Sequence, residues 1–168
     1  LDETVNYEVV TYEGFAPAKV PVIVECLTDN KNRTASEIRV LFKKGQLSSP
    51  GSVTWMFHRW GMVEATHVDR SLDMETVAIE AGAQNVEALP AGDVPEGQMG
   101  ARFLCDPPDL DAVAKFLAQA KWTVTTSEMS WVAKNYLELS EAERKEVTDF
   151  LNELDEHDDV HRVYAALK

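Results

Sequence analysis

The first third of the chain alternates between apolar and polar residues, as strands with one buried face do. Residues 5–9 alternate in this way, and residues 20–27 form a nearly continuous apolar run. The glycine and proline between them predict a loop at residues 12–19. Val53, Trp55 and Phe57 alternate again, which predicts a third strand with its aromatic side chains in a core, ending at Trp60-Gly61.

The first helix is predicted at residues 34–44. Thr34 and Glu37 have the spacing of a capping box, in which each side chain bonds the backbone amide of the other residue. Ile38 opens an apolar stripe at helical spacing, which indicates a core-facing side. Gly45 is suited to the left-handed residue that ends many helices.

A different order of elements follows Trp60-Gly61. Apolar periodicity predicts strand, helix, strand, strand, helix and strand, at residues 62–68, 74–81, 86–89, 99–105, 110–117 and 123–131. Asp106 or Asp109 could cap the second of these helices. This order is the ferredoxin-like βαββαβ signature.

The last segment has a second capping box, Ser140 with Glu143, an apolar stripe over residues 147–154 and a strand at 160–165. We predict an α+β protein with two α/β sandwich domains. A ferredoxin-like βαββαβ unit, residues 62–136, is inserted into a discontinuous ββαβ…αβ domain of residues 1–61 plus 137–168. The alternative of three consecutive subdomains leaves the last helix and strand without a sheet to join.

Charge is distributed unevenly along the chain. The formal net charge of −13 argues against a protein that coats nucleic acid with its whole surface. Residues 30–60 nevertheless carry six basic residues against one acidic residue, whereas residues 136–160 carry two against ten. The basic segment, together with the helix N-terminus that favours anions, predicts a phosphate or ribosome contact. Its candidate residues are Asn30, Lys31, Asn32, Arg33, Arg39, Lys43, Lys44 and Arg59.

Two alternatives to this contact stay open. The cations could form only the solvated face of an amphipathic helix, and Trp55 and Trp60 could stack on bases or simply pack in a core. The acidic segment at residues 136–160 could instead bind a basic protein partner.

Enzymatic chemistry has little support in the sequence. Common nucleotide-binding, hydrolase and zinc motifs are absent. Cys26 and Cys105 suit buried thiols in a reducing compartment, and a Cys26–His58 nucleophile pair would have no orienting third group. Residues 156–161 contain two histidines among carboxylates, but we interpret them as a solvated helix end rather than a metal site. We therefore expect no catalytic residue, metal or cofactor.

Nothing in the sequence predicts a membrane span or a signal peptide, so we expect a cytoplasmic protein without a membrane partner. The chain starts without methionine, and a preceding portion of the protein is therefore conceivable.

Five motifs together resemble the YebC family, which includes the mitochondrial translational activator of cytochrome c oxidase. They are Tyr12-Glu-Gly, Val24-Glu-Cys-Leu-Thr-Asp-Asn-Lys-Asn-Arg-Thr, Gly51-Ser-Val-Thr-Trp-Met-Phe, Ile79-Glu-Ala-Gly-Ala and Leu154-Asp-Glu-His-Asp-Asp-Val-His-Arg-Val-Tyr. The resemblance implies the family's second and third domains, the third inserted in the second, without its basic N-terminal helical domain. It also implies a non-enzymatic regulator of gene expression.

For the family, the resemblance implies DNA-binding transcriptional regulation or, alternatively, a ribosome-associated translation factor that relieves stalling. The partners would be DNA, ribosomal RNA or the ribosome, in the cytoplasm or in mitochondria if the protein is eukaryotic. Three segments depart from the family pattern: Phe15-Ala-Pro-Ala-Lys replaces a glycine-rich loop, Lys43-Lys-Gly-Gln-Leu-Ser-Ser-Pro is shortened, and Tyr164-Ala-Ala replaces Tyr-His-Asn. A close backbone approach through the lost glycines would be impeded.

Overall fold

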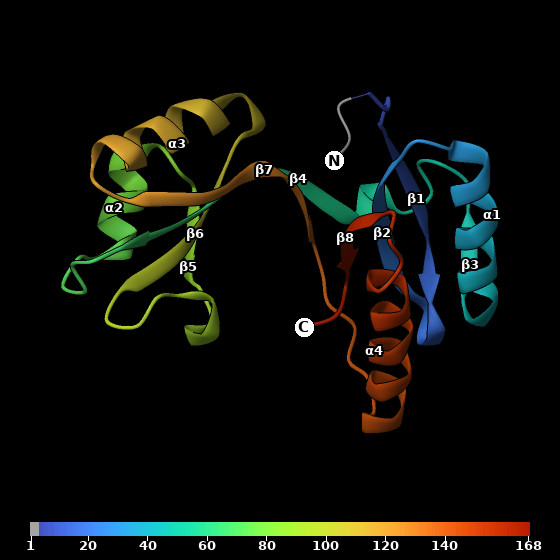
Figure 1. Cartoon of the computed structure of the whole chain (residues 1–168). Coiled ribbons are helices and arrows are strands. Elements are labelled where there is room, and N and C mark those ends of the chain that lie inside the picture. Colours follow the sequence, from blue (N-terminus) through green and yellow to red (C-terminus); the bar gives the residue numbers. More distant parts are fainter. Residues whose placement is uncertain (1–3) are drawn as a thin grey trace. The chain divides into compact units, whose positions relative to one another are not determined.

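A computed structural model describes residues 4–168 and divides the chain into two compact units. One unit contains the chain up to residue 58 together with residues 131–168, and the other contains residues 59–130. Each unit has a four-stranded antiparallel sheet with two α-helices (Figure 1). The predicted α+β fold with two sandwich domains is confirmed.

The sheet of the first unit has the order β3-β1-β2-β8. Its strands are β1 (Glu8–Ala16), β2 (Val20–Thr28), β3 (Gln46–Ser48) and β8 (Val160–Ala165). The helices α1 (Lys31–Leu41) and α4 (Glu141–Asp155) contact each other. Phe42, directly after α1, packs edge to face on Phe150 of α4 with ring centroids 5.3 Å apart. The core contains Val22, Val24, Ile38 and Leu154, all fully buried.

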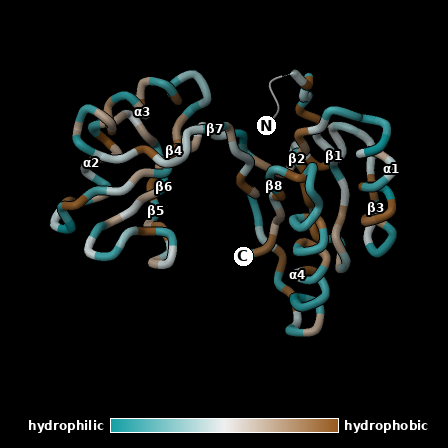
Figure 2. Tube along the Cα trace, viewed as in Figure 1, coloured by the Kyte–Doolittle hydropathy of each residue, from teal (hydrophilic) through white to brown (hydrophobic). Residues whose placement is uncertain are grey.

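The sheet of the second unit has the order β5-β6-β4-β7. Its strands are β4 (Phe57–His67), β5 (Asn85–Ala88), β6 (Met99–Cys105) and β7 (Thr123–Ala133), and its helices are α2 (Met74–Ala81) and α3 (Leu110–Gln119). Phe103 and Trp122 pack edge to face in its core. Figure 2 shows hydrophobic residues along the strands and a largely hydrophilic α4. The apolar stripes predicted the helices of both units, and the Ser140–Glu143 capping box is confirmed.

The predicted loop at residues 12–19 is mostly strand. β1 continues to Ala16, and only Pro17–Lys19 form the turn to β2. Gly14 allows this continuation, because a Cβ there would lie 2.3 Å from the Gln46 carbonyl oxygen of β3. The tight turn places Ala18 and Lys19 at φ of 62° and 60°, a left-handed conformation that costs non-glycine residues about 1 kcal/mol each.

The predicted strand at residues 53–57 is also wrong in part. Thr54–Met56 form a 3-10 turn, and Trp55 is 65% exposed rather than packed in a core. β4 starts at Phe57 and passes through Gly61 without a break. Gly61 is needed for close packing, because a Cβ would lie 2.9 Å from the Cys105 sulfur and 3.2 Å from Leu110 Cβ.

Two helix ends differ from the predictions. α1 ends at Leu41 and a 3-10 turn, Phe42–Lys44, follows, while Gly45 has φ of −126° and is not left-handed. Gly45 serves the approach of β3 to β1, because its Cβ would lie 2.1 Å from the Phe15 carbonyl oxygen. Neither aspartate proposed as a cap of α3 accepts a capping hydrogen bond with its side chain, and Asp106 instead accepts one from the Gln84 side chain.

Candidate functional site

The N-terminus of α1 is capped by Asn30, whose side-chain oxygen accepts from the Arg33 amide at 3.1 Å. The predicted capping box of Thr34 and Glu37 is therefore wrong, and the helix begins three residues earlier, at Lys31. Asn30 lies two residues after the end of β2 at Thr28, and asparagine is among the residue types preferred at a helix N-cap. The side chains of the predicted box are free to contact the C-terminal segment instead.

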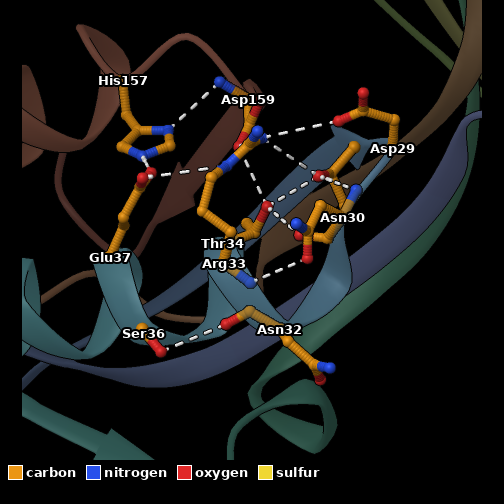
Figure 3. A network of polar contacts seen from close by, with 10 residues as sticks. Asp29, Asn30, Asn32, Arg33, Thr34, Ser36, Glu37, His157 and Asp159 are labelled. Atoms are coloured by element: carbon orange, nitrogen blue, oxygen red, sulfur yellow. Dashed lines mark hydrogen bonds and ion pairs between the residues drawn. The ribbon is translucent and has the colours of Figure 1, made fainter.

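Thr34 is fully buried and hydrogen-bonds α1 to Asp159 in the C-terminal segment (Figure 3). Its hydroxyl oxygen lies 2.9 Å from a carboxylate oxygen of Asp159 and 2.7 Å from the hydroxyl of Thr28. Because a carboxylate can only accept, Thr34 donates to Asp159, which leaves Thr28 to donate to Thr34.

Arg33 is surrounded by carboxylates. Its guanidinium lies 2.7 Å from Asp159 and 3.7 Å from both Asp29 and Glu37. Hydrogen bonding to Asp159 raises the pKa of Arg33. Burial by itself raises the pKa of Asp159, but hydrogen bonds from Arg33 and Thr34 and the Arg33 charge outweigh it, so that the pKa of Asp159 is lowered.

His157 completes the network with two different contacts. Its Nδ1 accepts from the Asp159 amide at 3.1 Å, so Nδ1 carries no proton there. Its Nε2 therefore bears the hydrogen and donates to Glu37, 2.5 Å away (Figure 3). The prediction of a merely solvated helix end is wrong for His157, whose side chain is only 15% exposed.

Glu37, His157 and Asp159 bring possible metal ligands within 4.8 Å of one another. These donor atoms already have protein partners, and the Arg33 guanidinium would repel a cation at Asp159. His161 of the sequence candidate lies on β8 and outside this group. The arrangement is typical of an ion-pair network rather than of a metal centre.

Most of the predicted contact residues lie on α1 and the turn after it, where they fall on two different faces. We define the paired face as Arg33, Glu37 and Lys44, which contact Asp159, His157 and Glu153 of the C-terminal segment. We define the outer stripe as Asn32, Ser36, Arg39 and Lys43, which recur every three to four residues and are exposed.

The remaining predicted contact residues lie elsewhere. Lys31 forms an exposed ion pair with Glu8, 3.3 Å away. Arg59 is exposed on β4 and belongs to the unit of residues 59–130. Within residues 4–168, Arg39 and Lys43 make no ion pair. They are therefore the predicted cations best able to meet an anionic ligand.

A second local structure, which the sequence did not predict, is built on Glu13. This side chain is 6% exposed and accepts from the amides of Gly51, Val53 and Thr54 at 2.6, 3.0 and 2.9 Å. Burial by itself raises the pKa of Glu13, but these donors more than offset it, and the pKa is lowered. An acid at an inward-facing strand position is the signal that could have revealed this role.

Nucleophilic chemistry at Cys26 is disfavoured. Cys26 is fully buried, and burial with the charges of Asp159 and Glu25 raises the pKa of its thiol to about 12. The thiolate is thus scarce near neutral pH. The predicted burial of both free cysteines is confirmed. None of the described helices has the length and apolarity that a membrane crossing requires.

The fold and the site define a two-unit α+β protein whose described polar clusters are ion pairs and caps rather than a catalytic constellation. A family model described as "TACO1/YebC second and third domain" matches residues 7–167. The chain belongs to this family, and the predicted resemblance is confirmed.

Relatives and a solved structure agree with this assignment. A Pseudomonas syringae pv. tomato protein named "Probable transcriptional regulatory protein" is 50% identical over 169 residues, which are 99% of this chain and 69% of the relative. A Bdellovibrio bacteriovorus protein named "Probable transcriptional regulatory protein Bd1964" is 47% identical with the same coverage. A conserved hypothetical protein, Aq1575 from Aquifex aeolicus, has a TM-score of 0.83 and 32% identity, covering 100% of this chain and 68% of that one.

Proposed function

We propose that this protein is a non-enzymatic regulator of gene expression that binds nucleic-acid phosphates through the outer stripe of α1. The names of its relatives support a role in transcriptional regulation. The observation that carries the proposal is the pair of exposed cations Arg39 and Lys43, which have no acidic partner within the described chain.

The chain around the outer stripe is unusual for so acidic a protein. Residues 38–63 contain no aspartate or glutamate, although the whole chain has 29. Asn32 adds a side-chain amide to the same face, and such side chains commonly bond phosphate oxygens beside arginine and lysine. The hydroxyl of Ser36 on this face donates to the Asn32 carbonyl at 3.1 Å. The stripe thus offers charge and hydrogen bonds without a competing carboxylate on that face.

The start of α1 is less suited to phosphate than the sequence predicts. Asp29, Asp159 and Glu8 lie within ion-pair distance of Arg33 or Lys31, so that three carboxylates face two cations and the local charge balance is negative. A phosphate there would have to displace carboxylates from the cations. We therefore place the contact on the outer stripe and not on the loop before α1.

Fluorescence anisotropy of labelled nucleic acid at low and moderate salt tests the proposal. One arm uses a DNA duplex and the other a ribosomal RNA hairpin, because both offer phosphates. Reversing the charge of Arg39 and Lys43 together, R39E with K43E, should weaken binding about tenfold or more and should lower the salt slope by roughly two.

The matched control, K115E with K121E, reverses the charge of two exposed lysines of the other unit and changes the net charge by the same amount as R39E with K43E. Equal weakening by both double variants would show a general charge effect and would contradict the proposal. Preference for DNA or RNA decides between transcriptional and ribosome-associated regulation.

A second candidate, the docking of a basic protein, is favoured by a hollow of about 390 Å³ beside α4. Its lining includes Glu146, Asp149 and Glu153, with Phe150 and Pro17 supplying apolar surface. This candidate predicts capture of a basic protein from lysate that survives nuclease treatment and is lost on reversal of Glu146.

A further inference from the structure

Trp55 presents a large aromatic ring on a turn that the protein holds firmly. The ring is 65% exposed, while its flanking residues Val53 and Phe57 are buried in the core. Glu13 binds the amides of Val53 and Thr54, and the Met56 carbonyl accepts from the Lys134 amide at 2.9 Å. The turn is thus fixed from both sides while its one aromatic side chain remains in solvent.

The orientation of the ring is fixed as well. Its Nε1 donates to the Ser52 carbonyl at 2.9 Å, which uses the only hydrogen-bond donor of the indole. The ring therefore offers its apolar faces and no free polar group. A ligand that is recognised through a flat face, without a hydrogen bond to the indole, is a stacking partner.

The exposed charges near Trp55 along the chain favour an anionic partner, because the Glu13 carboxylate under the turn is buried and already bonded to backbone amides. The ring lies within the acid-free residues 38–63, and the exposed Lys134, whose amide bonds the turn, makes no ion pair inside the described range. Tyr136, which is 45% exposed, follows two residues later, and the next acid is Glu138. Aromatic rings beside unpaired cations are the combination by which proteins bind single-stranded nucleic acid.

We infer that Trp55 is a base-stacking residue that binds an unpaired nucleotide of single-stranded nucleic acid. The inference deepens the proposed function: phosphate contacts at the outer stripe are common to paired and unpaired strands, whereas stacking on Trp55 requires an unpaired base. Stacking on Trp55 would thus give the protein a preference for single-stranded over double-stranded nucleic acid, which the cations alone do not supply.

A titration with a fluorescein-labelled oligouridylate of about twelve nucleotides tests this inference. Substituting Trp55→Ala should weaken binding about tenfold, and Trp55→Phe, which keeps a ring, should restore most of the loss. Ile79→Ala is the matched control, because it removes another large, exposed apolar side chain and should leave binding unchanged. Denaturant unfolding of each variant confirms that it folds.

A duplex of the same length separates stacking from charge. Trp55→Ala should bind the duplex with an affinity within about twofold of the wild type. An equal loss of affinity for the duplex and for the single strand would overturn the inference. The inference is also overturned if Trp55→Ala binds oligouridylate as well as the wild type does, or if the wild type does not bind it. If R39E with K43E weakens binding while Trp55→Ala does not, the proposed function stands and only the stacking inference fails.

Discussion

The paired face and the outer stripe of α1 carry similar cations in different surroundings. On the paired face, Arg33 and Lys44 contact carboxylates of the C-terminal segment, and Glu37 contacts its histidine. On the outer stripe, Arg39 and Lys43 face solvent. Neighbouring cations of one helix can therefore have separate roles, and residues more than a hundred positions away in the chain decide which cation is available to a ligand.

The largest expected effect comes from breaking the paired face at its centre. Asp159→Ala leaves the buried Thr34 hydroxyl and the Arg33 guanidinium without their shared acceptor. We expect a loss of about 2 kcal/mol in the free energy of unfolding, measured by urea denaturation. The neighbouring Asp158→Ala, which removes an exposed carboxylate, should change the free energy by less than about 0.5 kcal/mol. Similar values for the two variants would contradict the described network.

A smaller effect is expected from pH. The pKa of Asp159 is lowered in the folded chain, so the folded state binds fewer protons there than the unfolded state does. Its stabilisation is therefore present above roughly pH 4 and is lost as the pH falls through the folded pKa. The free energy of unfolding of the wild type should approach that of Asp159→Asn on acidification. Glu13, whose pKa is also lowered, contributes equally to both proteins, so its effect cancels when their free energies of unfolding are subtracted. If that difference does not change with pH, the stabilisation does not depend on ionisation of Asp159.

The smallest effect is expected on the outer stripe. Arg39→Gln and Lys43→Gln should each change the free energy of unfolding by less than about 0.5 kcal/mol. Arg33→Gln should destabilise the chain more than either, because it leaves Asp159 without its cation. An outer-stripe variant that destabilises as much as Arg33→Gln would indicate that its cation has a structural partner.

Local sequence patterns predicted structure well where the partners are close in the chain. The capping box of Ser140 and Glu143 forms, whereas the same spacing at Thr34 and Glu37 does not. Asn30 provides an earlier cap, and Asp159 and His157 bond the two side chains from the far end of the chain. Spacing alone contains no information about such distant partners.

The lack of information about distant partners also explains why the candidate site was predicted only in part. The sequence identified the basic segment but could not divide it, since Glu153 and Asp159 neutralise Lys44 and Arg33 only after folding. Trp55 alternates with apolar neighbours and was therefore predicted in a core. The buried Glu13 carboxylate turns the backbone at Val53 and Thr54 and leaves the ring outside.

Each unit contains one buried free cysteine, Cys26 in β2 and Cys105 in β6. Burial raises the pKa of both thiols, and alkylating reagents react with exposed thiolates. Labelling of either cysteine therefore has to wait for its own unit to open. The labelling rates of the two cysteines, resolved by peptide mass spectrometry, therefore report separately how often each unit opens, without any substitution in the protein.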